Sequence, residues 1–166
     1  MELSEVLQAR YSVRKYAKKE VEEEKIAAIL EAARIAPTAK NLQPVKIRVA
    51  KGAEMEKLAV ATKCTFGAPL AFIVATGGEC YERFYDKKQS YDTDAAIVAT
   101  YMMLRATDLG LGTCYVMAYQ PDLPKAEFPC LANYASACIL ICGYAAEDSV
   151  PSERHGSRKA LGDILL

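Results

Sequence analysis

Three residues near the N-terminus have the types and the spacing of an anion-binding segment. Arg10, Ser12 and Arg14 alternate within five residues. Two guanidinium groups can bind a phosphate through forked, charge-assisted hydrogen bonds, and a serine hydroxyl with nearby backbone N–H groups can complete the cage. Each charged hydrogen bond contributes roughly 1.5–3 kcal/mol. Taken alone, the segment is either a phosphate site or a solvated basic patch that follows a short helix.

A second polar cluster spans residues 36–44, with the sequence APTAKNLQP. Asn41 and Gln43 each carry hydrogen-bond donors and acceptors. Such side chains match the edge of a heterocycle in which carbonyl and N–H groups alternate. The alternative is a structural Asx turn closed by Pro37 and Pro44.

These clusters must be positioned by helices and strands that the hydrophobic pattern indicates. Residues 20–37 carry a helical apolar stripe, and shorter helices are expected at residues 4–11, where Ser4 could be the cap, and at residues 54–63. Alternating or continuous apolar runs predict strands. The expected strands are residues 45–50, 70–76, 113–117 and 135–144, and the polar stretch at residues 76–91, with its paired glycines, is expected to be a loop or lid.

Residues 93–110 form the most apolar expected helix, TDAAIVATYMMLRATDLG, which Asp92, Thr93 or Asp94 could cap. A helix that is apolar nearly all round must be buried on several sides. It is either part of a dimer interface or a central helix covered by its own sheet. Helices and strands mix without strict βαβ alternation, so the fold class is α+β, in a single domain of residues 1–166.

Composition excludes several classes of function. The 166 residues carry no formal net charge, which argues against a broad nucleic-acid surface. No apolar stretch approaches the roughly 20 residues of a membrane span, and the N-terminus lacks a secretory pattern, so a cytoplasmic location is expected. Six cysteines without a Cys-x-x-Cys pair and a single histidine predict no metal site. The incomplete glycine pattern after the long helix does not fit a dinucleotide fingerprint.

In their order along the chain, these segments resemble the nitroreductase family. The matching positions are Arg10, Ser12 and Arg14; Ala36, Pro37, Thr38, Asn41, Gln43 and Pro44; Asp94-Ala95-Ala96; Leu109 to Thr113; Gly143-Tyr144; and Arg158-Lys159. The likeness covers essentially the whole chain and is to the short branch of the family. It implies an α/β sandwich with a central mixed, mainly antiparallel sheet flanked by helices, a long buried central helix, and a homodimer with two FMN sites at its interface.

The resemblance also implies roles for individual residues. Arg10, Tyr11, Ser12 and Arg14 would hold the phosphate and ribityl end of FMN, with Arg158 and Lys159 as a late basic contact. The segment with Pro37, Thr38, Ala39, Asn41 and Gln43 would contact the ring or ribityl chain across the dimer interface. Tyr115, Val116 and Met117 would lie along the isoalloxazine; Tyr115 is either a stacking residue or an ordinary core tyrosine.

The implied activity is reduction of small electron-poor acceptors, of nitroaromatic or quinone type, in two steps with NADH or NADPH as the donor. The flavin performs the chemistry, so no side chain is assigned as a catalytic residue. Two alternatives stay open: an FMN-binding or redox-sensing dimer with little turnover, and a related flavin reaction such as reductive dehalogenation. Val45 and Tyr115 stand where many short members have tryptophan, so the substrate pocket should differ.

Overall fold

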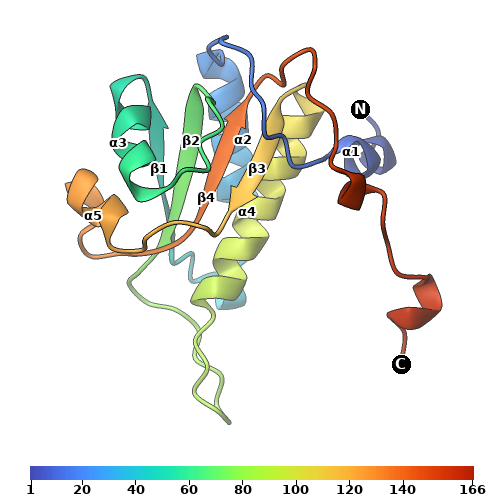
Figure 1. Ribbon diagram of the computed structural model, residues 1–166. Coiled ribbons are helices and arrows are strands. Elements are labelled where there is room, and N and C mark those ends of the chain that lie inside the picture. The colour runs from blue at the N-terminus through green and yellow to red at the C-terminus, as the bar shows by residue number, and fades with distance from the viewer.

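A four-stranded antiparallel sheet forms the centre of the protein in a computed structural model that describes residues 1–166 (Figure 1). Its strands are β1 (Val45–Lys51), β2 (Leu70–Thr76), β3 (Gly112–Val116) and β4 (Ala135–Gly143), in the order β1-β2-β4-β3. All three neighbouring strand pairs are antiparallel, and the one parallel pairing is an isolated bridge between Ser12 and Thr113. The expected α+β architecture is confirmed.

Helices lie on both faces of the sheet, because successive apolar side chains of β2 point to opposite faces and both must be covered. Phe72 and Val74 pack with α2 (Glu23–Ile35) and α4 (Tyr91–Asp108) on one face, whereas Ala71 and Ile73 face the opposite core. That second core includes Leu58 of α3 (Ala53–Ala61) and lies near α5 (Leu123–Glu127) (Figure 1). Because both faces are covered, every residue of β2 is buried.

The long helix α4 is covered by its own chain on one side, which is one of the two arrangements that its apolar sequence left open. Ala95, Ala99 and Met102 are fully buried against the sheet and α2, so one side of the helix is covered by its own chain. Thr100 and Tyr101 on another side are exposed. Tyr101 also lines an apolar groove of about 590 Å³ with residues of α1 (Leu3–Ala9), including Leu3 and Leu7, that are themselves exposed. This chain therefore leaves a second side of α4 uncovered.

The helix caps differ from those expected. Glu2 is the N-cap of α1 and donates its N–H to the Glu5 carboxylate at 3.0 Å, and Ser4 lies inside the helix. α4 begins one residue after Ser90, so the acidic side chains of Asp92 and Asp94 lie in its first turn. There they face the positive end of the helix dipole.

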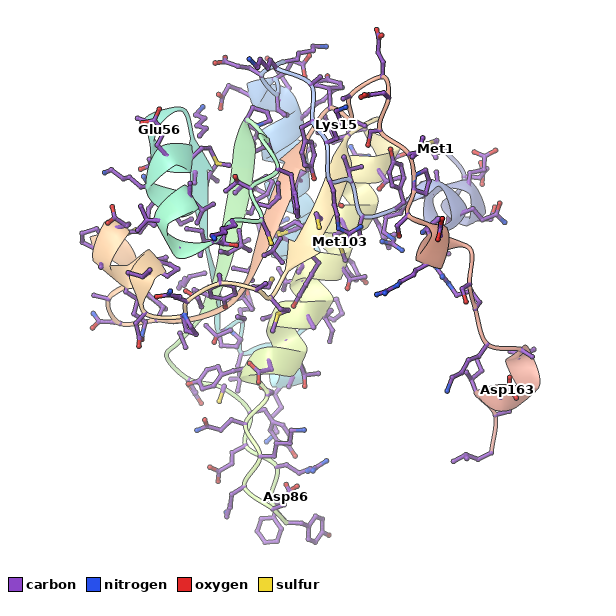
Figure 2. All side chains as sticks on the ribbon, viewed as in Figure 1. Met1, Lys15, Glu56, Asp86, Met103 and Asp163 are labelled. Atoms are coloured by element: carbon purple, nitrogen blue, oxygen red, sulfur yellow. The ribbon has the colours of Figure 1, made fainter.

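Two segments extend away from this body (Figure 1). Between β2 and α4 the chain forms a hairpin with a bridge between Glu82 and Gln89, where a polar loop was expected. After β4 the chain runs outwards to a 3-10 turn at Leu161–Asp163, which stands clear of the rest (Figure 2). The helices nowhere combine the length and apolar character needed to cross a membrane.

Candidate functional site

The arginine segment, residues 10–14, lies along the outer edge of β3. Arg10 caps the end of α1 through its N–H, which donates to the carbonyl of Val6 at 3.1 Å. Three residues on, the N–H of Val13 donates to the carbonyl of Thr113 at 2.9 Å. The Val13 side chain is buried against Gly112, where an added Cβ would lie 2.4 Å from it. Glycine at position 112 therefore lets the segment approach the sheet closely.

The chain that follows β4 supports the other side of this region. Ala17 donates its N–H to the carbonyl of Tyr144 at 2.9 Å, and Ala146 donates to the carbonyl of Lys15 at 3.0 Å. Tyr11 places its hydroxyl 3.4 Å from the hydroxyl and carbonyl oxygens of Ser149. The segment is thus held between β3 and the strand-like continuation of β4.

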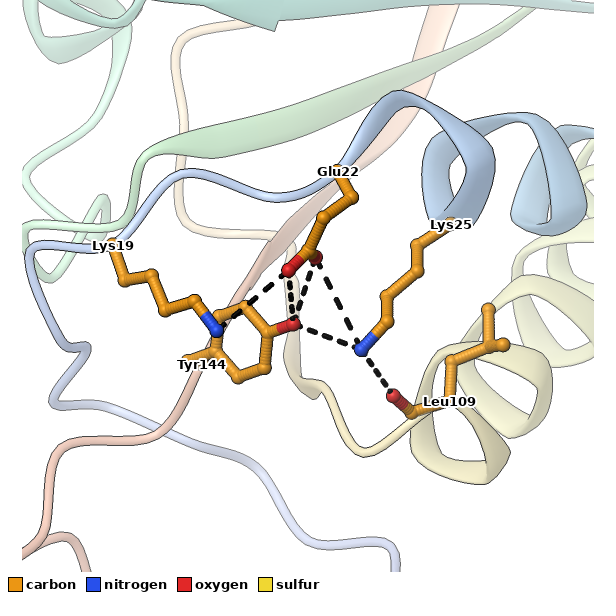
Figure 3. Close-up of polar contacts among 5 residues, drawn as sticks. All are labelled: Lys19, Glu22, Lys25, Leu109 and Tyr144. Atoms are coloured by element: carbon orange, nitrogen blue, oxygen red, sulfur yellow. Dashed lines mark hydrogen bonds and ion pairs between the residues drawn. The ribbon is translucent and has the colours of Figure 1, made fainter.

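A polar network around Tyr144 fixes that continuation to two helices (Figure 3). The Tyr144 hydroxyl donates to Glu22 at 2.7 Å and accepts from the Lys25 ammonium at 2.8 Å. Lys25 also donates to the carbonyl of Leu109 at the end of α4, at 3.0 Å, and the Lys19 ammonium lies 3.9 Å from the Tyr144 ring centre. The hydroxyl lowers the pKa of Glu22 and raises the pKa of Lys25, because it bonds to their charged forms.

The arginines of the chain divide into two groups. Four form ion pairs with carboxylates on their own or neighbouring elements; these are Arg34, Arg48, Arg83 and Arg105. The other four have no carboxylate partner, and all belong to the arginine segment or to the C-terminal tail, residues 150–166. These are Arg10, Arg14, Arg154 and Arg158. Guanidinium groups that no internal carboxylate neutralises are available to an external anion.

The tail is joined to the arginine segment at one aromatic contact. The rings of Tyr11 and His155 meet edge to face with centres 6.1 Å apart. Arg158 folds back onto the same turn, donating to the carbonyl of Ser157 at 2.7 Å. Lys159 is exposed on the outgoing chain. The tail turn is therefore docked on the segment, although no direct contact joins Arg158 to Arg10 or Arg14.

The second polar cluster forms a loop anchored to the first turn of α4. The N–H of Ala39 donates to the carboxylate of Asp94 at 2.9 Å, and the Ser90 hydroxyl donates to the same carboxylate at 2.7 Å. Asp94 is only 1% exposed. Its position in the sequence suggested a helix cap, whereas the structure shows a buried acceptor that positions the loop.

The backbone of this loop is strained at several positions. Lys40, Asn41 and Gln43 have φ of 50°, 56° and 53°, in the left-handed region. Such conformations cost of order 1–3 kcal/mol each for residues other than glycine and concentrate at functional sites, although asparagine tolerates them better. Hydrogen bonds close the loop from within: the Gln43 N–H donates to the Thr38 hydroxyl at 3.0 Å, and the Gln43 amide donates to the Asn41 carbonyl at 3.2 Å. In this conformation the side chains of Asn41 and Gln43 are exposed.

The residues expected along the flavin ring lie at the end of β3. Tyr115 is half-buried, and burial raises the pKa of its hydroxyl, so it stays protonated at neutral pH. Met117 is exposed, as is Pro37 in the loop before β1. Val116 is buried in the core on the α3 face, so its side chain is not available to a ligand.

One chain does not bring the three groups of residues into a single site. The bridge from Ser12 to Thr113 lies beyond the C-terminal end of α4, whereas the loop containing Asn41 is bonded to its N-terminal end. Eighteen residues of helix separate these ends by about 27 Å. β3 runs between them, from Thr113 near the arginine segment to the exposed Met117.

The three buried cysteines are not activated thiols. Burial raises the pKa of Cys138 to about 11 and that of Cys142 to about 12, and it also raises the pKa of Cys114. All six cysteines are free, and the structure contains no group of three His, Cys, Asp or Glu side chains placed to hold a metal ion.

The fold and the candidate site together define an α+β protein with an antiparallel sheet between helical layers. Unpaired arginines lie at one end of its long helix, and a strained amide-bearing loop lies at the other. Residues 7–69 match the model of the nitroreductase family. A nitroreductase family protein from Clostridium difficile 630 is similar in structure, with a TM-score of 0.92 and 37% identity over all of this chain and 98% of that one.

Two further relatives agree with that match. A putative NADH dehydrogenase/NAD(P)H nitroreductase from Methanothermobacter thermautotrophicus is 32% identical over 89% of this chain and 80% of its own length. A structure from Clostridium difficile R20291, named an FMN-dependent nitroreductase, is 29% identical with a TM-score of 0.72 over 93% of this chain and 96% of that one. The chain belongs to the nitroreductase family.

Proposed function

We propose that the protein is an FMN-dependent oxidoreductase that passes electrons from NADH or NADPH to small electron-poor acceptors of nitroaromatic or quinone type. Membership of the family supports the general class of oxidoreductase. One relative is named as FMN-dependent and another as an NADH dehydrogenase/NAD(P)H nitroreductase. The observation that carries the proposal is the pair of arginines without carboxylate partners, Arg10 and Arg14, on a segment that is hydrogen-bonded to β3.

The residues present fit the chemistry of FMN. Its phosphate carries about two negative charges near neutral pH, and Arg10 and Arg14 offer two guanidinium groups with no competing carboxylate. The Ser12 hydroxyl lies between them in sequence, and Arg158 with Lys159 would add positive charge from the docked tail. The backbone of the segment is already ordered by the bonds of Val13 and Ala17, so binding would cost little additional entropy.

We further propose that two chains complete each site. Because Asn41 and Gln43 lie at the opposite end of α4 from Arg10, the loop with Pro37, Thr38 and Ala39 would contact the flavin held by the partner. The open side of α4 and its groove with Leu3 and Leu7 supply an apolar surface for that association.

FMN, when bound, would supply the reversible hydride and electron transfer between the nicotinamide donor and the acceptor. The protein's part is to bind and orient. The arginine segment would hold the phosphate, the Asn41 and Gln43 amides would bond to the polar edge of the ring, and β3 would support the ring through Tyr115, Met117 and the backbone of Val116. The protonated Tyr115 can donate a hydrogen bond, and no side chain is assigned as an acid or a base.

The first test is the visible spectrum of the purified protein, with the released cofactor identified. We expect a yellow protein with one FMN per chain that oxidises NADH or NADPH when a nitroaromatic or a quinone is supplied. Colourless protein that takes up no FMN would contradict the proposal. Bound FMN without turnover by either donor would instead favour a binding or redox-sensing dimer.

A further inference from the structure

A pocket that has no assigned role opens beside the expected flavin-ring residues. It has a volume of about 350 Å³ and lies where the end of β3, the first turn of α4 and the start of β4 meet. Its lining residues are Asp92, Tyr115, Met117, Tyr119, Pro121, Ser136 and Ala137. Because Tyr115 and Met117 belong to both regions, a molecule in this pocket would lie next to the ring that β3 is proposed to support.

The polar groups in this pocket have unused hydrogen-bonding capacity. The Asp92 carboxylate makes no hydrogen bond or ion pair within the chain, and Asp92 lines the pocket together with Tyr115 and Tyr119. The Ser136 hydroxyl is buried without a partner. A buried hydroxyl without a hydrogen bond is unfavourable, and a bound ligand can supply the missing partner.

The hydroxyl of the second tyrosine in the pocket, Tyr119, is already hydrogen-bonded within the protein. Tyr119 donates its hydroxyl to the carbonyl of Ser136 at 2.8 Å, which holds its ring beside the pocket. Burial, with smaller contributions from Cys138 and Asp92, raises the pKa of Tyr119 to about 12. The two tyrosines therefore present flat, uncharged surfaces near neutral pH, which suit an aromatic ligand.

The charge of the pocket selects among aromatic ligands. Asp92 is its one charged lining residue, and no lysine or arginine lines it. A carboxylate near the hydroxyl of a buried serine favours a ligand that donates an N–H or O–H, and it disfavours a negatively charged ligand.

We propose that this pocket is the acceptor site and that it prefers neutral aromatic acceptors that carry an amino or hydroxyl substituent. Asp92 accepts the hydrogen bond of that substituent, Ser136 supplies a second polar contact, and Tyr115 and Tyr119 flank the aromatic ring. This assignment rests on the proposed flavin-dependent function and specifies its substrate class.

The test compares three nitroaromatics that differ in one substituent: 4-nitrobenzyl alcohol, 4-nitrotoluene and 4-nitrobenzoate. In the flavin-loaded wild-type protein, kcat/KM should fall in that order. Asp92→Asn should reduce the preference for the alcohol over the toluene about fivefold and should improve the benzoate, mainly through KM. Ser136→Ala should reduce only the preference for the alcohol. Glu56→Gln, on the exposed side of α3, is the matched control and should change neither.

Equal effects of Asp92→Asn on all three acceptors would overturn the proposal, as would a loss of FMN affinity, which would place the flavin itself in the pocket. Binding of 4-nitrobenzyl alcohol is also followed by NMR, where the signals of Ser136, Tyr115 and Tyr119 should shift. Their invariance would overturn the assignment whatever the turnover. Failure of the proposed function is distinguishable, because it appears as protein without flavin.

Discussion

The two ends of α4 carry the two halves of the candidate site, and they are prepared in different ways. At the C-terminal end, the chain that carries Arg10 and Arg14 is hydrogen-bonded to β3 and to the chain after β4, and these two cations have no carboxylate partner. At the N-terminal end, the exposed amide side chains of Asn41 and Gln43 are uncharged, and the backbone of their loop is strained by positive φ angles. We expect the arginine segment to bind its ligand through unpaired positive charge, and the Asn41 loop to bind through amide groups that a strained backbone positions. The two ends should therefore respond differently to substitution.

The largest effect is expected when the charge is removed. In Arg10→Gln/Arg14→Gln, the loss of two charged hydrogen bonds of roughly 1.5–3 kcal/mol each should weaken FMN binding about 10²- to 10⁴-fold. Riboflavin has no phosphate, so its affinity should stay unchanged. Titration of both flavins by fluorescence quenching measures the difference. Arg34→Gln, which removes an arginine paired with Glu31, is the control. If the double variant lost riboflavin affinity as much as FMN affinity, the arginine segment would not bind the phosphate.

A smaller effect is expected at the other end when the anchor of the loop is removed. Asp94→Ala leaves the Ala39 N–H and the Ser90 hydroxyl without their acceptor, which should cost about 1–3 kcal/mol of unfolding free energy. FMN and riboflavin affinities should fall together, because the loop is proposed to contact the ring or the ribityl chain. Urea denaturation and the same flavin titrations provide the measurements. Asp163→Ala in the exposed tail should change neither, and selective loss of FMN would contradict the division between the two ends.

The backbone strain can be separated from the side chain at Lys40. Glycine adopts a positive φ without the steric cost, so Lys40→Gly should raise the free energy of unfolding by up to about 1 kcal/mol relative to Lys40→Ala. Both variants lose the same side chain, which makes alanine the matched control. Flavin affinity should fall about threefold in the glycine variant because its loop is less ordered before binding. Identical stabilities would mean that the loop stores no strain at this position.

The smallest effect is expected at the polar network that supports the arginine segment. Tyr144→Phe removes the hydroxyl that lowers the pKa of Glu22 and raises the pKa of Lys25. A lowered carboxyl pKa contributes stability that is lost as pH falls, whereas a raised lysine pKa contributes stability that is lost as pH rises. The melting temperature of the wild type should therefore exceed that of the variant near pH 7, with the gap closing below about pH 4 and above about pH 11. A pH-independent gap would assign the effect to packing alone.

The sequence predicts the regular elements better than the loops between them. The stripe containing Ile26 and Ile29 and the apolar run of β2 specify a helix and a buried strand, because periodicity and burial are local signals. The positive φ at Lys40 and Gln43 carries no such signal, since neither residue type favours it. The hairpin at residues 82–89 lacks a glycine-containing tight turn and was expected as a loop.

The candidate site shows the same limit. Arg10, Asn41 and Gln43 are proposed as site residues from residue type and family resemblance, and the structure shows that their backbones lie at opposite ends of α4. The role of Asp94 could not be identified in this way, because an acidic residue near a helix start has the same pattern whether it caps the helix or anchors a distant loop. The contact between Tyr11 and His155 joins residues 144 positions apart, and no local pattern encodes it.

The central claim is that each flavin is held by the arginine segment of one chain and the loop of another. A mixed dimer tests it directly, with one chain carrying Arg10→Gln/Arg14→Gln and the other Asn41→Ala/Gln43→Ala. If the site is shared, one site combines the substituted arginine segment with the substituted loop, and the other site combines the two unsubstituted parts. The mixed dimer should therefore bind one FMN with wild-type affinity. If a single chain builds each site, both sites are damaged and no wild-type binding remains, which would contradict the account.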